Sequence, residues 1–158
     1  MKKHTPTVMK KLILSLIIVT IFTTCRKSAF IDDHFIFGQY YNYCNSNCVN
    51  YFMIKKDRLY IDDMTHPSKR LKFKNQTLTQ DKFNLAKQLV DILPENLKNS
   101  PSQSFGCPDC GDEGAYYIEI KKNRTSKKFH IEMDTAKLPK ELKNYIPEME
   151  KVISQLLK

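Results

Sequence analysis

The apolar and polar positions of this chain alternate with the period of a β-strand in its first half. Residues 34–44 and 48–56 are two runs rich in aromatic and β-branched side chains, and the turn-forming triplet 45–47 separates them. This arrangement predicts a hairpin. Residues 58–62 and 70–78 alternate apolar with charged positions, which predicts two more strands. We therefore expect the four runs to form an antiparallel meander.

The pattern changes to helical spacing at residue 79. Thr79 is placed as an N-cap and Pro94 as a stop signal, so the sequence between them predicts an amphipathic helix. The apolar positions on one stripe of this helix are Phe83, Ala86, Leu89, Val90 and Leu93. Residues 94–114 have no period and are rich in Pro, Asn, Ser and Gly, which predicts a long loop.

The C-terminal part predicts a second hairpin and a second helix. Residues 115–134 alternate on both sides of a turn at 123–125. One face of this hairpin is expected to be polar and to carry Glu119, Lys121, Lys128, His130 and Glu132. Residues 138–158 have an apolar stripe at helical spacing, and Pro147 is expected to divide them into a short turn and a longer helix.

The order of these elements, ββββ-α-ββ-α, predicts an α+β domain. We expect an antiparallel sheet of about six strands with two helices packed on one face, in a single domain at residues 34–158. Both alternation phases of the first two strands carry large apolar side chains. The second sheet face is therefore expected to be covered as well, either by a loop or by a partner, since aromatic side chains are enriched at binding surfaces.

The N-terminus has the pattern of a leader. Lys10 and Lys11 precede an apolar run at 12–22, which ends at Thr24 and Cys25. The run has 11 residues, whereas a helix that crosses a bilayer needs about 20. A basic region, an apolar region and a cleavage region in this order predict a signal peptide.

An apolar run that stops on Cys25 resembles the lipobox of bacterial lipoproteins. The resemblance implies that residues 1–24 are a signal peptide that is removed and that Cys25 becomes the acylated first residue. It also implies that residues 25–33 form a tether and that the chain is held at the membrane of the cell envelope, facing the periplasm or the exterior. An ordinary secretory signal, with Cys25 incidental, is the alternative.

Removal of the leader lowers the positive charge of the chain. The whole sequence has 26 basic and 17 acidic residues, but residues 1–24 contain four Lys and no acid. The mature chain would therefore carry 22 basic against 17 acidic residues, a net charge of +5. This modest excess, without a recognisable binding motif, argues against nucleic acid as a partner.

Four further cysteines occur as two close pairs, Cys44 with Cys48 and Cys107 with Cys110. An even number of cysteines in a small exported chain favours disulfides, because that compartment is oxidising. Three pairings are open, and we favour the two local ones because short spacings close rapidly. Cross-pairing would close loops of about 60 residues and would stabilise the fold by roughly 4 kcal/mol for the first bond.

Two other interpretations of these cysteines are open. All four could converge on zinc as thiolate ligands, although thiolates would have to survive oxidation. A redox role for Cys107 and Cys110 is the other, since a CxxC at a helix N-terminus favours the thiolate. Here residues 111–114 lead into a strand, and nearby carboxylates would oppose a thiolate.

The loop that contains the second cysteine pair is a possible binding surface. The residues that would form it are Phe105, Asp109, Asp112 and Glu113. The three acids could bind calcium, but their spacing does not match a known calcium loop. Asp62, Asp63 and His66 read as a hydrophilic turn, and His130 beside Glu119 reads as an ordinary exposed strand face.

These patterns favour a non-catalytic role. The sequence contains no nucleophile elbow, no Gly-rich phosphate loop and no HExxH motif, and no cofactor is expected. We expect a membrane-anchored lipoprotein with a binding or structural role and an unidentified protein partner. The alternatives are a thiol oxidoreductase or metal-binding protein that uses Cys107 and Cys110, and an inhibitor that presents the long loop to a partner enzyme.

Overall fold

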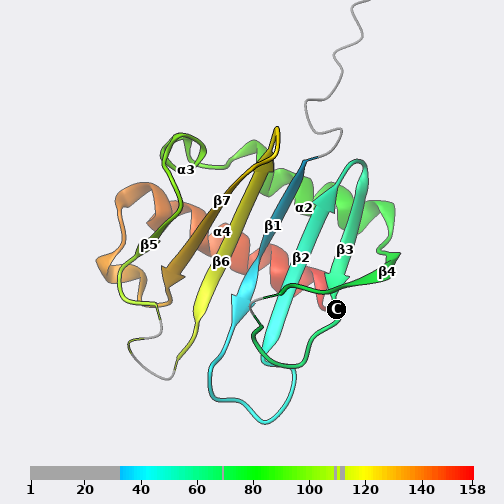
Figure 1. Cartoon of the computed structure of the whole chain (residues 1–158), viewed down its shortest axis with the longest axis horizontal. Helices are drawn as coiled ribbons and strands as arrows, with labels where there is room; N and C mark the ends of the chain where they lie inside the picture. The colour runs from blue at the N-terminus through cyan, green and yellow to red at the C-terminus, as the bar shows by residue number, and fades with distance from the viewer. Residues whose placement is uncertain (1–32, 69, 109, 111–112) are drawn as a thin grey trace, which may run out of the picture.

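The computed structural model describes residues 33–68, 70–108, 110 and 113–158. The strand-forming runs of the first half become four neighbouring antiparallel strands, as the alternation predicts. Their bounds are β1 (His34–Tyr40), β2 (Val49–Lys55), β3 (Arg58–Asp62) and β4 (Phe73–Thr77). The second hairpin consists of β6 (Ala115–Lys122) and β7 (Thr125–Glu132). Strand β1 lies at the centre of the sheet because it pairs with both β2 and β6 (Figure 1).

Two long helices cover one face of the sheet, as expected (Figure 1). Helix α2 (Gln80–Asp91) begins after Thr79, whose hydroxyl accepts a hydrogen bond from the backbone N–H of Lys82. Helix α4 (Lys140–Leu156) follows a short 3₁₀ turn, η1 (Thr135–Lys137). The hydroxyl of Tyr145 donates to the carbonyl of Leu89 and so joins the two helices. No helix in the described part of the chain has the length and apolar character that crossing a bilayer requires.

The prediction of a long loop at residues 94–114 is wrong in part. It contains a short helix, α3 (Glu95–Asn99), and a short strand, β5 (Gln103–Phe105). Strand β5 pairs in parallel with β7, so the sheet has seven strands in the order β4-β3-β2-β1-β6-β7-β5 and is mixed. The prediction of about six strands, all antiparallel, is therefore corrected in number and in direction. A strand of three residues is too short to show a period of two, and its pairing depends on a neighbour far along the chain.

The prediction that Pro147 divides the last helix is also wrong. Helix α4 is continuous from Lys140 to Leu156 with Pro147 inside it. The apolar stripe has the same phase on both sides of the proline, and its buried members include Ile146 and Met149. Packing of this stripe on the sheet therefore keeps the helix continuous, although proline removes one backbone hydrogen bond.

Apolar side chains are buried on both faces of the sheet. The larger core lies under the helices and contains Phe37, Phe52 and Phe129. A smaller core lies on the opposite face and contains Ile36, Tyr40, Val49, Tyr51, Ala115 and Tyr117. Met64, Leu71 and Phe73, from the segment that joins β3 to β4 and from β4 itself, pack against it. The cover expected on the second face is therefore supplied, over the smaller core, by this segment of the chain.

Candidate functional site

The most connected polar group in the described structure is the carboxylate of Glu119. It lies on β6 and faces away from the helices, and the residue is only 6% exposed. Its Oε1 accepts hydrogen bonds from the Nε2 of His34 at 3.2 Å and from the Oγ of Ser126 at 2.6 Å. Its Oε2 accepts one from the hydroxyl of Tyr117 at 2.7 Å. The Nζ of Lys128 is 4.0 Å from the same oxygen.

Strand register brings these groups together from three strands. Tyr117 and Glu119 are two residues apart on β6 and therefore share a face. Glu119 pairs directly with Lys128 on β7, and with Ile36 on β1. His34 is two residues before Ile36 and so lies on the same face. Alternation placed Glu119 on the polar face, but the contribution of β1 depends on a pairing between strands about 80 residues apart.

The hydrogen bonds set the ionisation of this cluster. Burial alone would raise the pKa of Glu119, but hydrogen bonds from His34, Ser126 and Tyr117 lower that pKa to about 2. Burial and the neighbouring Glu119 carboxylate raise the pKa of the Tyr117 phenol far above its usual range. Near neutral pH the carboxylate is therefore ionised and the phenol is protonated. The cluster is a fixed charge network, and neither group exchanges a proton readily.

His130 lies among aromatic rings. Its ring centroid is 5.1 Å from that of Tyr117 and 6.4 Å from that of Tyr40. The centroid of Tyr51 is 5.4 Å from that of Tyr117, so these rings form a continuous aromatic cluster within the smaller core. The imidazole that contacts Glu119 belongs to His34, which sequence reasoning did not single out.

The start of the described chain is fixed to the body of the domain. Asp33 is only 5% exposed, and its Oδ1 accepts a hydrogen bond of 2.8 Å from the backbone N–H of Asn123 in the β6–β7 turn. Asp33 was expected in the tether, but this contact places it in the folded domain. Residues 25–32 of the predicted tether, Cys25 among them, lie outside the described residues. In the described part of the chain, the first contacts with the domain come from Asp33 and His34.

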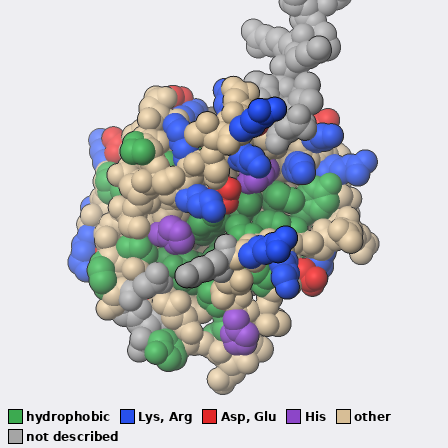
Figure 2. Space-filling model, in the orientation of Figure 1, with side chains coloured by type: hydrophobic (Ala, Val, Ile, Leu, Met, Phe, Trp, Pro, Cys, Tyr) green, Lys and Arg blue, Asp and Glu red, His purple; other side chains and the backbone are tan. Residues whose placement is uncertain are grey.

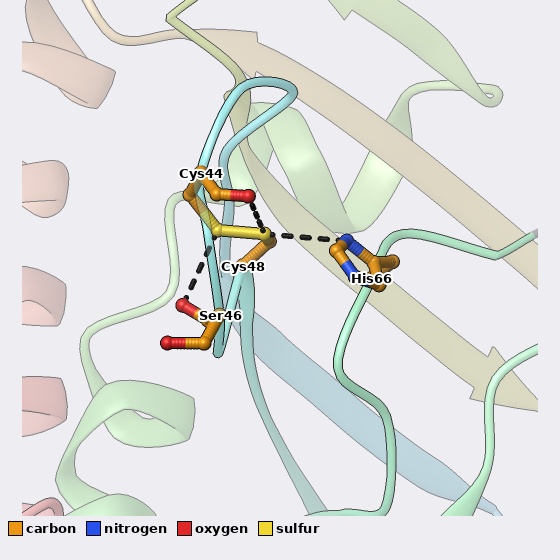
Figure 3. The surroundings of a disulfide bond; sticks show 4 residues. All are labelled: Cys44, Ser46, Cys48 and His66. Carbon is orange, nitrogen blue, oxygen red and sulfur yellow. Dashed lines mark hydrogen bonds between the residues drawn. A yellow bond between two sulfur atoms is a disulfide. The ribbon is translucent and has the colours of Figure 1, made fainter.

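The first disulfide joins Cys44 to Cys48 in the connection between β1 and β2. Cys48 is fully buried, and its Sγ is 3.4 Å from the Nδ1 of His66, as Figure 3 shows. The backbone N–H of Cys48 donates to the carbonyl of Thr65 at 2.9 Å. The disulfide turn is thus bonded to the segment that covers the smaller core.

Asp62 fixes the other end of that covering segment. Its two carboxylate oxygens accept hydrogen bonds from the backbone N–H groups of Tyr51 and Met64, at 2.8 Å and 3.1 Å. Burial raises the pKa of Asp62 above its ordinary value despite these bonds. The hydrophilic turn expected at Asp62, Asp63 and His66 lines a hollow of about 670 Å³ on this side of the sheet. The hollow is open, and its lining also includes Arg70.

The second disulfide joins Cys107 to Cys110 in an exposed turn before β6. Glu132 at the end of β7 supports this turn, because its Oε2 accepts a hydrogen bond of 3.1 Å from the backbone N–H of Cys107. Gly106 has a φ of +71°, and a Cβ there would lie 2.1 Å from the same oxygen. Glycine is therefore required for the close approach of the turn to β7.

The predicted binding loop is only partly a surface. Phe105 packs inward on Phe129, with ring centroids 6.2 Å apart, and belongs to the edge of the larger core. Glu113 is exposed and lines a hollow of about 440 Å³ beside the second disulfide. Asp109 and Asp112 lie outside the described residues.

Local pairing of the cysteines agrees with the favoured prediction. The zinc alternative requires Cys44, Cys48, Cys107 and Cys110 to converge as thiolates, whereas the structure holds them in two separate disulfides. Within residues 33–68, 70–108, 110 and 113–158, no three His, Cys, Asp or Glu side chains are grouped to hold a metal ion.

Neither the models of known protein families nor the curated proteins contain a match to this chain.

Proposed function

We propose that this chain is an exported lipoprotein, acylated at Cys25, whose α+β domain has a binding or structural role at the cell envelope. Its support comes from the leader pattern that ends on Cys25 and from two disulfides, which are typical of chains that fold in an oxidising compartment. The domain would be held at the membrane, with no transmembrane helix required.

The junction at the start of the domain is the observation that carries this proposal. Asp33 follows Cys25 by eight residues and is already bonded to the β6–β7 turn. His34 is bonded to the buried Glu119 on the central part of the sheet. A domain held by its N-terminus needs a firm attachment at this point, and two buried carboxylates provide it.

The same geometry supports a non-catalytic role. Glu119 is the strongest candidate for acid–base chemistry by burial, yet hydrogen bonds occupy both of its oxygens. A general base operates best with a pKa near the working pH, whereas the pKa of Glu119 is about 2. We therefore assign Glu119 to the attachment of β1.

Expression of the full chain in a bacterial host that acylates lipoproteins tests the proposal. We expect the protein in the membrane fraction and a mature N-terminal peptide that begins at Cys25 and carries the mass of acyl chains. A Cys25→Ser variant should lose that mass and should keep its leader. A mature chain cleaved elsewhere, with an unmodified Cys25, would refute the anchor.

Thiol–disulfide exchange is a second candidate, favoured by the exposure of both Cys107 and Cys110. Exchange would transfer a disulfide to a reduced substrate protein, with Cys107 and Cys110 gaining two electrons and two protons. Incubation of the oxidised chain with a reduced, unfolded protein should then produce disulfides in that protein at the rate at which Cys107 and Cys110 become free thiols. A Cys107→Ser and Cys110→Ser variant that is equally active would exclude this role.

A further inference from the structure

Positive charge is concentrated at one end of the sheet. Residues 33–158 contain 20 Lys or Arg and 16 Asp or Glu. The turns of two hairpins hold six of these basic residues and one acid, Asp57; the six are Lys55, Lys56, Arg58, Lys121, Lys122 and Arg124. We call these six residues the basic rim. Without the rim and Asp57, the rest of 33–158 contains 14 basic and 15 acidic residues, which is close to neutral.

Register places the basic rim beside the start of β1. His34 pairs with Lys55 on one side and with Lys121 on the other. The β2–β3 and β6–β7 turns therefore lie on either side of the point where the chain enters the sheet (Figure 1). Lys and Arg side chains gather at the same end of the space-filling view (Figure 2). The carboxylate of Asp33 is bonded to Asn123 between the rim residues of the second turn.

The rim charges are available to a ligand. Five of the six residues are exposed and Lys121 is partly exposed. Among the described residues, none of the six forms an ion pair. Within the described residues, their positive charges are therefore not paired with carboxylates.

Backbone conformation gives an independent reason to regard the rim as functional. Lys56 has a φ of 56° and Arg124 a φ of 69°. Both lie in the left-handed region, where turns favour Gly, Asn or Asp and a long side chain is strained. Each hairpin therefore has a basic side chain at a position where glycine would be more favourable, and strain of this kind clusters at functional sites.

We propose that the basic rim binds the anionic phospholipid headgroups of the membrane to which the domain is anchored. The inference rests on the proposed acylation of Cys25. Residues 26–33 span at most about 30 Å when extended, so the anchor keeps the rim close to the bilayer. Basic side chains beside a lipid anchor add electrostatic attraction to anionic lipids to the attraction of the acyl chains. Each basic residue near an anionic surface strengthens binding by roughly fivefold.

Lysine acetylation on vesicles tests the proposal with the full acylated chain. The protein is reconstituted in phosphatidylcholine vesicles and in vesicles with about 30% phosphatidylglycerol. An amine-reactive reagent is added, and mass spectrometry follows each lysine. We expect Lys55, Lys56, Lys121 and Lys122 to react roughly threefold or more slowly on the anionic vesicles. Salt at about 0.5 M should remove the difference, because it screens charges beyond about 5 Å.

Matched charge reversals distinguish an effect of the rim residues from an effect of the total charge of the protein. The Lys56→Glu and Lys122→Glu variant changes two exposed turn positions and should lose the protection of Lys55 and Lys121. The Lys87→Glu and Lys140→Glu variant makes the same change in charge on α2 and α4. It should keep the protection of Lys55 and Lys121. Lys143, exposed on α4, serves as an internal reference whose rate should not depend on the lipid.

Equal acetylation rates on the two kinds of vesicle would overturn the rim proposal. The mass of the N-terminal peptide in the same samples reports separately on acylation of Cys25. An acylated chain without protection would therefore refute the rim alone, whereas an unmodified Cys25 would refute the anchor. Protection on neutral vesicles that appears only after polyglutamate is added would assign the surface to an acidic protein and would also overturn the proposal.

Discussion

The imidazole of His34 lies 3.2 Å from the carboxylate of Glu119, and this contact joins the first residue of β1 to the middle of β6. Glu119 also accepts hydrogen bonds from Tyr117 and Ser126, so one buried carboxylate holds groups from three strands. Because β1 is the central strand, loss of this contact would loosen the point where the chain enters the sheet. Two predictions follow from the ionised state of Glu119.

Glu119→Gln should destabilise the domain. The amide keeps the shape of the side chain but removes its negative charge and directs an N–H₂ group at donors. Hydrogen bonds to a charged group contribute about 1.5–3 kcal/mol each to stability, so we expect a loss of roughly 2–3 kcal/mol in the free energy of unfolding. Urea titration followed by circular dichroism measures it. Glu141→Gln, at an exposed position of α4, is the control and should change stability by less than about 0.5 kcal/mol.

The contribution of Glu119 should disappear in acid. Its pKa falls from an ordinary value of 4.5 to about 2 in the folded protein. A lowered folded pKa stabilises the fold above the unfolded pKa, and this gain is lost as the pH falls from about 4.5 towards about 2. The stability difference between the native chain and Glu119→Gln, measured by urea titration from pH 6 to about pH 2.5, should therefore shrink across that range. A constant difference would show that Glu119 is not ionised.

Alternation along the strands was enough to predict most of the sheet. The alternation at β3, β6 and β7, the aromatic and β-branched runs at β1 and β2, and the Thr79 cap of α2 were visible locally. Strand β5 was not, because three residues show no period and its pairing with β7 is not local. The predicted division of the last helix at Pro147 was wrong, because packing of α4 on the sheet outweighs the loss of one backbone hydrogen bond.

The site was harder to predict than the fold. The sequence put His130 and Glu119 on the polar face of one hairpin, which was interpreted as an exposed strand face, whereas Glu119 is buried. The histidine that contacts Glu119 is His34, and identifying it requires knowing that β1 pairs with β6. The basic rim was hidden for the same reason. Its residues lie in two turns about 65 positions apart in sequence, and only the register of β1 with β2 and β6 brings them together.

The two disulfides should be reduced in a fixed order. Cys107 and Cys110 are both exposed, whereas Cys44 is only partly exposed and Cys48 is fully buried against His66. A reductant must reach a sulfur atom in order to attack it, so we expect the Cys107–Cys110 bond to open first. Graded reduction, alkylation and mass spectrometry measure the order. Peptides that join Cys44 or Cys48 to Cys107 or Cys110 would contradict the local pairing itself.

Pro147→Ala should stabilise the domain. Pro147 is an exposed residue in the interior of α4, where proline removes one backbone hydrogen bond and crowds the preceding turn. Proline in a helix interior costs about 3 kcal/mol relative to alanine when the helix cannot adjust. We expect a gain of up to that amount in thermal unfolding experiments. Glu148→Ala, at the next exposed position, should change stability by less than about 0.5 kcal/mol. A loss of stability in Pro147→Ala would mean that the curvature of α4 matters for its packing.

The Arg124→Gly variant tests whether the left-handed backbone at Arg124 destabilises the domain. Its comparison with Arg124→Ala distinguishes the effect of backbone strain from the effect of the lost charge. The β6–β7 turn has Asn123 at a φ of 51° and Arg124 at 69°, and Asn-Gly is the pair preferred when both central residues have positive φ. Relief of the left-handed strain should raise the free energy of unfolding by about 1 kcal/mol. Arg124→Ala removes the same charge but keeps a Cβ at positive φ, so it should not gain this stability. Urea titration of the two variants measures the difference.

Vesicle binding shows whether the strained arginine has a function. If Arg124→Gly is more stable and yet binds anionic vesicles more weakly, the arginine is retained at the expense of stability, as a functional residue would be. Equal stability of the two variants would show that the turn is not strained at Arg124.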